Sequence, residues 1–166
     1  IWGYDRIPEH NRVPLTLSQP TQRDLVCGTL RDLLCAACFH EAMTLSFITP
    51  ELFGLFRPEP DRSPLSVEHS SRRQENLLRQ SLVPSLLQSR RENERHGTFG
   101  VDLFEIANVY LEAHPGAEGS EPTRVTAVTG RSFGELKGIC EAMVTHLAPH
   151  ARLSAEPLEL PGLGDG

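Results

Sequence analysis

The chain has 166 residues, 39% hydrophobic and 23% charged, which is enough for one domain with a hydrophobic core. No apolar run approaches the roughly 18–20 residues that span a bilayer, and the first residues lack the pattern of a signal peptide. The net charge of −6 argues against a domain that binds RNA over its whole surface, because neutralising phosphates requires basic residues. Any contact with nucleic acid is therefore expected to be local.

Residues 1–20 are expected to form an irregular linker that leaves an upstream domain. Pro8, Pro14 and Pro20 disfavour a helix in this short, mixed segment. Because the chain also begins without Met, we expect it to be a piece of a longer protein.

The first helix is predicted over residues 22–39. Thr21 followed by Asp24 is typical of a helix N-cap. One stripe, at about 100° per residue, holds the side chains that should face a core: Val26, Cys27, Leu30, Leu33, Leu34, Ala37 and Cys38. Leu25 and Phe39 lie off this stripe, so the helix has more apolar surface than one sheet face would cover.

Four cysteines raise the question of a metal site or a disulfide. The pair formed by Cys35 and Cys38 lacks the second ligand pair that structural zinc sites have, while Cys27 and Cys38 share the apolar stripe. Free cysteine is among the most buried residue types. We therefore expect Cys27, Cys35, Cys38 and Cys140 to be buried, reduced thiols without a metal, as in a cytosolic protein.

A half-buried strand is predicted for residues 41–47, where large apolar residues alternate with smaller or polar ones. Met43, Leu45 and Phe47 would then face the core.

A short helix is expected over residues 49–56, because a threonine cap precedes a proline at the first helical position. The polar, proline-containing residues 57–75 form a loop. A second long helix should follow over residues 81–95, with Leu82 and Leu86 facing inward.

The longest strand is predicted within residues 99–111. The apolar residues alternate with one parity up to Leu103 and with the other parity from Phe104 onward. This change favours either a strand buried on both faces or a bulge. Residues 124–129 form a further strand, and the capping box of Ser132 and Glu135 begins a third helix with a clear apolar face.

The order of elements favours an α+β fold, in which helices flank an antiparallel sheet. Three strands make an incomplete sheet, so we expect a truncated domain over residues 21–150. Residues 151–166 lose all pattern and are expected to be a flexible or truncated tail.

Six stretches, taken together and in order, resemble one family. They read IWGYDRIP from residue 1, HEAMTLSF from 40, SPLSVE from 63, LRQSLVPSLL from 78, LFEIANVYL from 103 and FGELKG from 133. This order is similar to the catalytic-like module of the bacterial phenylalanyl-tRNA synthetase beta subunit. The chain departs from the family in residues 69–78, which we expect to be an exposed insertion. The family arginine is placed at Arg79, with Arg72 or Arg73 as rivals.

The resemblance implies a class II aminoacyl-tRNA synthetase-like fold that has lost its active site. It implies a non-catalytic assembly role in a cytoplasmic phenylalanine–tRNA ligase of two alpha and two beta subunits, with no membrane contact. The alpha subunit would use ATP and magnesium, and the whole enzyme would bind phenylalanine tRNA. The family's magnesium ligands lie upstream of this segment, so no cofactor is expected here. Leu25 and Phe39 are the residues we place at the alpha-subunit interface.

The residues themselves offer little for catalysis. An adenylating site needs cationic side chains beside the reacting phosphates, and class II enzymes carry an arginine two residues before a glutamate on a strand. Residues 103–106 supply Glu105 without an arginine, and Arg124 lies outside them. We predict no catalytic residue and a structural role for Glu105.

Arg90, Arg91 and Arg95 form the densest basic patch, but Glu92 and Glu94 interrupt it. The patch is either a solvated helix face or a tRNA phosphate contact. The alternatives to an assembly module are a free-standing class II synthetase-like adenylating enzyme and a small nucleic-acid-binding domain. The missing cationic site argues against the first, and the acidic composition argues against the second.

Overall fold

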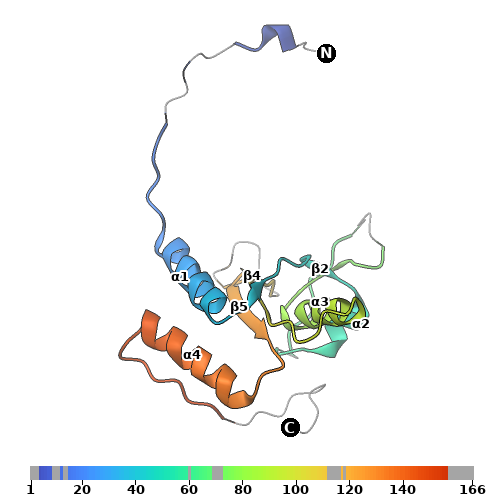
Figure 1. Cartoon of the computed structure of the whole chain (residues 1–166). Helices are drawn as coiled ribbons and strands as arrows, with labels where there is room; N and C mark the ends of the chain where they lie inside the picture. The colour runs from blue at the N-terminus through green and yellow to red at the C-terminus, as the bar shows by residue number, and fades with distance from the viewer. Residues whose placement is uncertain are drawn as a thin grey trace.

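The computed structural model describes residues 4–8, 12, 15–59, 61–68, 73–111, 117 and 119–156. Within them, helices and short strands alternate along the chain (Figure 1). The helices are η1 (Tyr4–Arg6), α1 (Gln22–Ala36), α2 (Pro50–Leu55), α3 (Val83–Arg95) and α4 (Phe133–Leu147). The strands are β1 (His40–Glu41), β2 (Phe47–Ile48), β3 (Leu77–Leu78), β4 (Leu103–Asn108) and β5 (Thr123–Val128).

The central sheet has the order β1-β4-β5, and a second sheet pairs β2 with β3. Strands β4 and β5 are antiparallel, in one uninterrupted register from the Leu103–Val128 pair to the Asn108–Thr123 pair. No bulge therefore lies near Leu103, and the alternative of a strand buried on both faces is confirmed. The expected α+β class is also confirmed. The central sheet is mixed rather than wholly antiparallel, because β1 runs parallel to β4.

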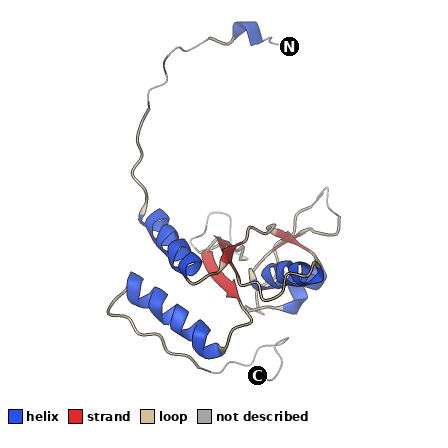
Figure 2. Ribbon diagram, in the orientation of Figure 1, coloured by secondary structure: helices blue, strands red, loops and turns tan. Residues whose placement is uncertain are grey.

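Helices cover both faces of the central sheet (Figure 2). On one face, Phe104 of β4 packs with Leu34 of α1 and with apolar residues of α4. On the other face, Leu103 packs with Leu82 and Leu86 at the start of α3. The predicted α2, α3 and α4 are confirmed, with Thr49 capping α2 and a Ser132 capping box on α4.

Helix α1 ends three residues earlier than predicted, in a Schellman motif. The Cys38 N–H donates to the Cys35 carbonyl at 2.9 Å, and the Phe39 N–H donates to the Leu34 carbonyl at 3.0 Å. Cys38 occupies the left-handed position, with φ of 64°, that usually holds glycine. The hydrophobic contact typical of this motif then folds Phe39 onto Leu34. Phe39 is thus a core residue that follows the helix.

The continuous strand predicted over residues 41–47 is not formed: β1 ends at Glu41, β2 begins at Phe47 in the second sheet, and residues 42–46 between them are not strand. Exposure still alternates along this segment, but in the opposite phase to the one predicted. Met43 is 94% exposed, and Leu45 and Phe47 are exposed as well. The alternate residues turn inward, because the Ala42 N–H donates to the Phe104 carbonyl at 2.7 Å and Thr44 contacts a buried carboxylate. The prediction that Met43, Leu45 and Phe47 face the core is therefore wrong.

The prediction that residues 69–78 form an exposed insertion is wrong for the last residues of this range. Residues 69–72 lie outside the described part of the chain, whereas Leu77 and Leu78 form β3 and pair with β2. Residues 77–78 are thus part of the fold and not an exposed loop. Removing all of 69–78 would delete a strand, so we expect it to exceed the roughly 1 kcal/mol effect of shortening a surface loop.

The two ends of the chain contribute little to the described fold. Residues 15–20 and 151–156 are exposed and form no helix or strand, and residues 157–166 of the expected tail lie outside the described part. No helix among the described residues combines the length and apolar character needed to cross a membrane.

Candidate functional site: a closed polar centre, an acidic cavity and an exposed apolar edge

A buried ion pair lies between the central sheet and the segment that leads into α3. The Nη1 atom of Arg79 is 3.0 Å from Oε1 of Glu105, and both side chains are 3% exposed. The Thr44 hydroxyl donates to Glu105 Oε2 at 2.6 Å and accepts from Arg79 Nη1 at 2.8 Å. The pair and Thr44 therefore form a closed polar centre in which each charge is already satisfied.

The backbone explains how Arg79 reaches this place. Its N–H donates to the Ser46 carbonyl at 3.0 Å, and its carbonyl accepts from the Tyr110 N–H at 2.9 Å. Arg79 is therefore held between the segment after β1 and the end of β4. Its Nε also donates to the Asn108 carbonyl at 3.2 Å.

This geometry corrects the sequence interpretation that Glu105 has no arginine partner. The partner comes from 26 residues upstream rather than from the same strand. One signal could have found it. Arg79 directly follows Leu77 and Leu78 and precedes Leu82 and the buried start of α3, and a buried cation requires a carboxylate nearby. The predicted structural role of Glu105 agrees with this contact.

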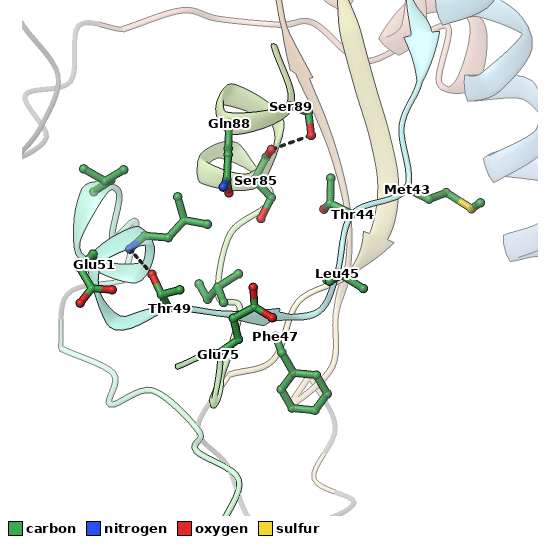
Figure 3. Close-up of a pocket in the computed structure, with 13 residues that line it drawn as sticks. Met43, Thr44, Leu45, Phe47, Thr49, Glu51, Glu75, Ser85, Gln88 and Ser89 are labelled. Carbon is green, nitrogen blue, oxygen red and sulfur yellow. Dashed lines mark hydrogen bonds between the residues drawn. The ribbon is translucent and has the colours of Figure 1, made fainter. Parts of the chain in front are cut away.

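A cavity of about 520 Å³ lies beside the polar centre and shares Thr44 with it. Ser85, Gln88 and Ser89 of α3 form one wall, and Thr49 and Glu51 line the α2 side (Figure 3). Figure 3 also shows the side chains of Met43 and Phe47 pointing away from its centre.

The cavity has the wrong charge for a nucleoside triphosphate. Among the described residues that line it, the charged ones are Glu51 and Glu75. Hydrogen bonds from the Glu51 backbone N–H and the Thr49 hydroxyl lower the pKa of Glu51, so this carboxylate is ionised at neutral pH. Catalytic phosphate sites instead present cations or metal ions to the developing negative charge.

A second polar cluster joins the ends of several elements. Asp102, just before β4, accepts from Arg131 Nε and from the Thr129 hydroxyl, each at 2.6 Å. Arg131 also donates to the Ala37 carbonyl at 2.9 Å and lies 4.9 Å from the centre of the Phe39 ring. The cluster therefore ties the end of α1 to the turn between β5 and α4.

The contacts of Asp102 predict that the free energy of unfolding decreases at acidic pH. Burial raises the pKa of Asp102, but the hydrogen bonds from Thr129 and Arg131 and the charge of Arg131 outweigh burial, so the net shift is downward. Because the pKa of Asp102 is lower in the folded chain than its ordinary value of 3.8, the ionised carboxylate stabilises the fold at pH values above 3.8. This stabilisation is lost as the pH falls through the folded-state pKa. We expect Asp102→Asn to be about 1–3 kcal/mol less stable at pH 7, with the difference shrinking below pH 4.

Urea denaturation at pH 7, 5, 4 and 3 would measure this effect. Glu121→Gln, at an exposed position, serves as the control. A difference between Asp102→Asn and the wild type that stays constant from pH 7 to pH 3 would refute the linkage.

The two residues predicted for a subunit interface have different environments. Leu25, in the first turns of α1, is 53% exposed, whereas Phe39 is 2% exposed and covered by this chain's own core. The interface prediction for this helix therefore rests on Leu25. Met43 and Leu45, on the segment that continues the edge strand β1, add exposed apolar side chains that the sequence interpretation had placed inside.

The arginine patch on α3 is largely engaged within the helix. Arg90 Nε is 3.1 Å from Glu94 Oε1, and Arg95 Nη1 is 3.3 Å from Glu92 Oε2. The Arg90 guanidinium also lies against Gly130, where an added Cβ would be 2.7 Å from Nη2. These contacts favour a solvated helix face, and a tRNA contact through Arg90, Arg91 and Arg95 stays a prediction.

The cysteines are less buried than predicted. Cys35 and Cys38 are exposed, Cys27 and Cys140 are half-buried, and all four are free thiols. The expectation of four buried thiols is therefore wrong, because Cys38 lies in the turn after α1 and not on its inner face. No group of three or more histidine, cysteine, aspartate or glutamate side chains within the described ranges is placed to hold a metal ion.

The absence of a structural metal stays a prediction. We expect elemental analysis of the purified chain to show well under one zinc per molecule, because two thiols fill only half of a tetrahedral site. Stoichiometric zinc that disappears in Cys35→Ser would contradict this expectation.

Comparison with solved structures first defines the class of the fold. A pyrrolysyl tRNA synthetase of Desulfitobacterium hafniense matches with a TM-score of 0.59 and 21% identity, over 75% of this chain and 44% of that chain. An ATP phosphoribosyltransferase regulatory subunit/histidyl-tRNA synthetase from Bacillus halodurans C matches with a TM-score of 0.63 and 12% identity, over 86% of this chain and 39% of that chain. The fold is that of a class II aminoacyl-tRNA synthetase.

The family follows from sequence comparison. The family model described as the phenylalanyl tRNA synthetase beta chain CLM domain matches residues 8–166, and the chain belongs to this family. The phenylalanine–tRNA ligase beta subunit of Rhodopirellula baltica is 35% identical over 170 residues, covering all of this chain and 25% of the relative. That of Coxiella burnetii is 32% identical over 136 residues, covering 81% of this chain and 16% of the relative.

The resemblance inferred from the six motifs is thereby confirmed. The chain spans a quarter or less of the length of these curated relatives.

Proposed function

We propose that this chain is a non-catalytic assembly module of the beta subunit of phenylalanine–tRNA ligase. One observation carries the proposal. The arginine and glutamate that the fold brings together, Arg79 and Glu105, satisfy each other inside the core and leave neither charge open to a substrate. The charged residues described around the neighbouring cavity are the carboxylates Glu51 and Glu75, whereas an adenylating site would need cations.

The remaining parts of the proposal concern the whole enzyme. Two alpha and two beta subunits would assemble in the cytoplasm, and the alpha subunits would attach phenylalanine to its tRNA using ATP and magnesium. The module would comprise residues 21–150, with residues 1–20 as a linker from an upstream domain and 151–166 as a tail. Its role would be to present a folded surface to the alpha subunit.

Exposed apolar groups support an assembly surface. Within α1 only Leu34 is fully buried, and none of the residues of α4 is. Leu25 on α1 and Met43 and Leu45 beside β1 add large exposed apolar side chains. A partner that covered these side chains would remove them from water, which favours association.

The function is tested by two measurements on the same preparation. We expect no phenylalanine-dependent ATP–pyrophosphate exchange by the partner-free chain, because none of the described residues that line the cavity is a cation. We also expect it to co-purify with the alpha subunit from the same genome. Exchange above background in the partner-free sample would overturn the non-catalytic role, and a folded chain that fails to bind the alpha subunit would overturn the assembly role.

A further inference from the structure

The turn that ends α1 carries two exposed cysteines, Cys35 and Cys38, three positions apart in the chain. Cys35 is the next-to-last residue of α1, and the Cys38 N–H donates to its carbonyl at 2.9 Å. The intervening residues are helical or nearly so, since the cap residue Ala37 has φ of −80° and ψ of 10°. Helical geometry over three residues places the Cα atoms of Cys35 and Cys38 on the order of 5 Å apart. Disulfides join Cα atoms that are roughly 4.4–6.8 Å apart.

The backbone at Cys38 is a second, independent observation. Cys38 is the one non-glycine residue with a positive φ among the described residues, and the other positive φ values belong to Gly97, Gly100 and Gly119. A β-carbon makes this conformation less favourable than it is for glycine. The Schellman turn fixes this conformation, and it therefore fixes the backbone of Cys38 relative to Cys35.

The other thiol of α1 cannot compete for this pairing. Cys27 precedes Cys35 by eight positions, which corresponds to about 12 Å along the helix axis. That distance is beyond the reach of a disulfide. Of the cysteines in α1 and the turn that follows it, Cys35 and Cys38 are therefore the two that lie within reach of each other.

We propose that Cys35 and Cys38 form a reversible intramolecular disulfide by exchange with small-molecule disulfides. One cysteine thiolate attacks a sulfur of the reagent R–S–S–R, which forms a mixed disulfide and releases one R–S⁻. The second thiolate attacks the protein sulfur of that mixed disulfide and releases the second R–S⁻. Two electrons pass to the reagent, and the two cysteine protons end on the two released thiols.

The pairing is independent of the proposed function. Leu25 lies ten positions before Cys35, or about 15 Å along α1, whereas Met43 and Leu45 follow Cys38 by five and seven positions. The test therefore uses the chain without an alpha subunit, so its result does not depend on where that subunit docks. The bond would fix the Schellman turn that positions Phe39 on the core.

The test incubates the full 166-residue chain with oxidised glutathione, blocks remaining thiols with iodoacetamide and maps the peptides by mass spectrometry. We expect the wild-type peptide that contains both cysteines to lose two hydrogens without gaining glutathione, and dithiothreitol to reverse this loss. Cys38→Gly, which should fold well because glycine favours the left-handed position, is expected to hold a stable glutathione adduct on Cys35. Cys35→Ser should hold the adduct on Cys38.

Cys27→Ser is the matched control and should form the internal disulfide as the wild type does. The proposal is overturned if the wild type accumulates glutathione on either cysteine of the turn. It is equally overturned if the wild type forms only dimers linked between chains, or stays reduced at a glutathione concentration that modifies Cys38→Gly.

Discussion

Replacing Arg79 with alanine is expected to lower the free energy of unfolding by about 3–5 kcal/mol. The substitution leaves Glu105 buried, with the Thr44 hydroxyl and N–H as hydrogen-bond donors and without the cation that the described structure places beside it. A buried ion without its counter-ion is far less stable than the intact pair, whereas replacing both partners by apolar residues can be close to neutral. The loss is large compared with the roughly 5–15 kcal/mol that stabilises a typical domain.

Urea denaturation of Arg79→Ala, Glu105→Ala and the double variant Arg79→Met/Glu105→Leu would measure the effect. The matched control is Arg95→Ala, whose ion pair with Glu92 is more than half exposed and should contribute less than about 1 kcal/mol. If Arg79→Ala and Arg95→Ala lose similar stability, the polar centre does not hold the sheet to the segment before α3. A double variant more stable than either single variant would support the charge argument.

Introducing a charge at Phe39 is expected to unfold the isolated chain, whereas the same change at Leu25 is expected to disrupt only the assembly. Phe39→Asp places a carboxylate in a core shared with Leu34 and Phe104, and should cost more than about 4 kcal/mol. Leu25 is exposed near the N-terminus of α1, where an acidic side chain also favours the helix dipole. Leu25→Asp should therefore change the stability of the free chain by less than about 0.5 kcal/mol.

Thermal melts of the free chain and co-purification with the alpha subunit separate these two outcomes. Leu25→Asp should melt like the wild type yet bind the alpha subunit at least about 100-fold more weakly, because roughly 2.7 kcal/mol of desolvation would oppose docking. Leu25→Met should keep both the melting temperature and the affinity for the alpha subunit of the wild type. If Leu25→Asp binds the alpha subunit normally, this part of α1 is not the interface, and if Phe39→Asp melts normally, the packing of the turn after α1 is wrong.

The starts of three helices were predicted well from the sequence, because an N-cap depends only on residues a few positions apart. The capping boxes at Thr21 and Ser132 and the cap at Thr49 each involve residues three positions apart, and all three are present. The end of α1 was missed for a related reason. A helix stop is normally signalled by glycine at the left-handed position, and here Cys38 takes that place.

The orientation of residues 41–47 could not be read from their own alternation. Hydrophobic periodicity assigns the apolar phase to the core, but the groups facing this segment are a buried arginine and carboxylate. The Thr44 hydroxyl forms hydrogen bonds with these groups, which the apolar side chain of Met43 could not do. Since Arg79 and Glu105 come from elements distant in sequence, this preference depends on tertiary contacts. The sequence interpretation missed the pair of Arg79 and Glu105 for the same reason.

The parallel pairing of β1 with β4 has a consequence for how the chain folds. His40 pairs with Leu103, so closing this contact orders a loop of roughly sixty residues, whereas β4 and β5 close a much shorter loop. Contacts between distant segments form more slowly because their closure entropy is larger. We therefore expect β4, β5 and α3 to associate first and β1 to join last. Until then, the edge of β4 that β1 will cover stays open to other extended segments.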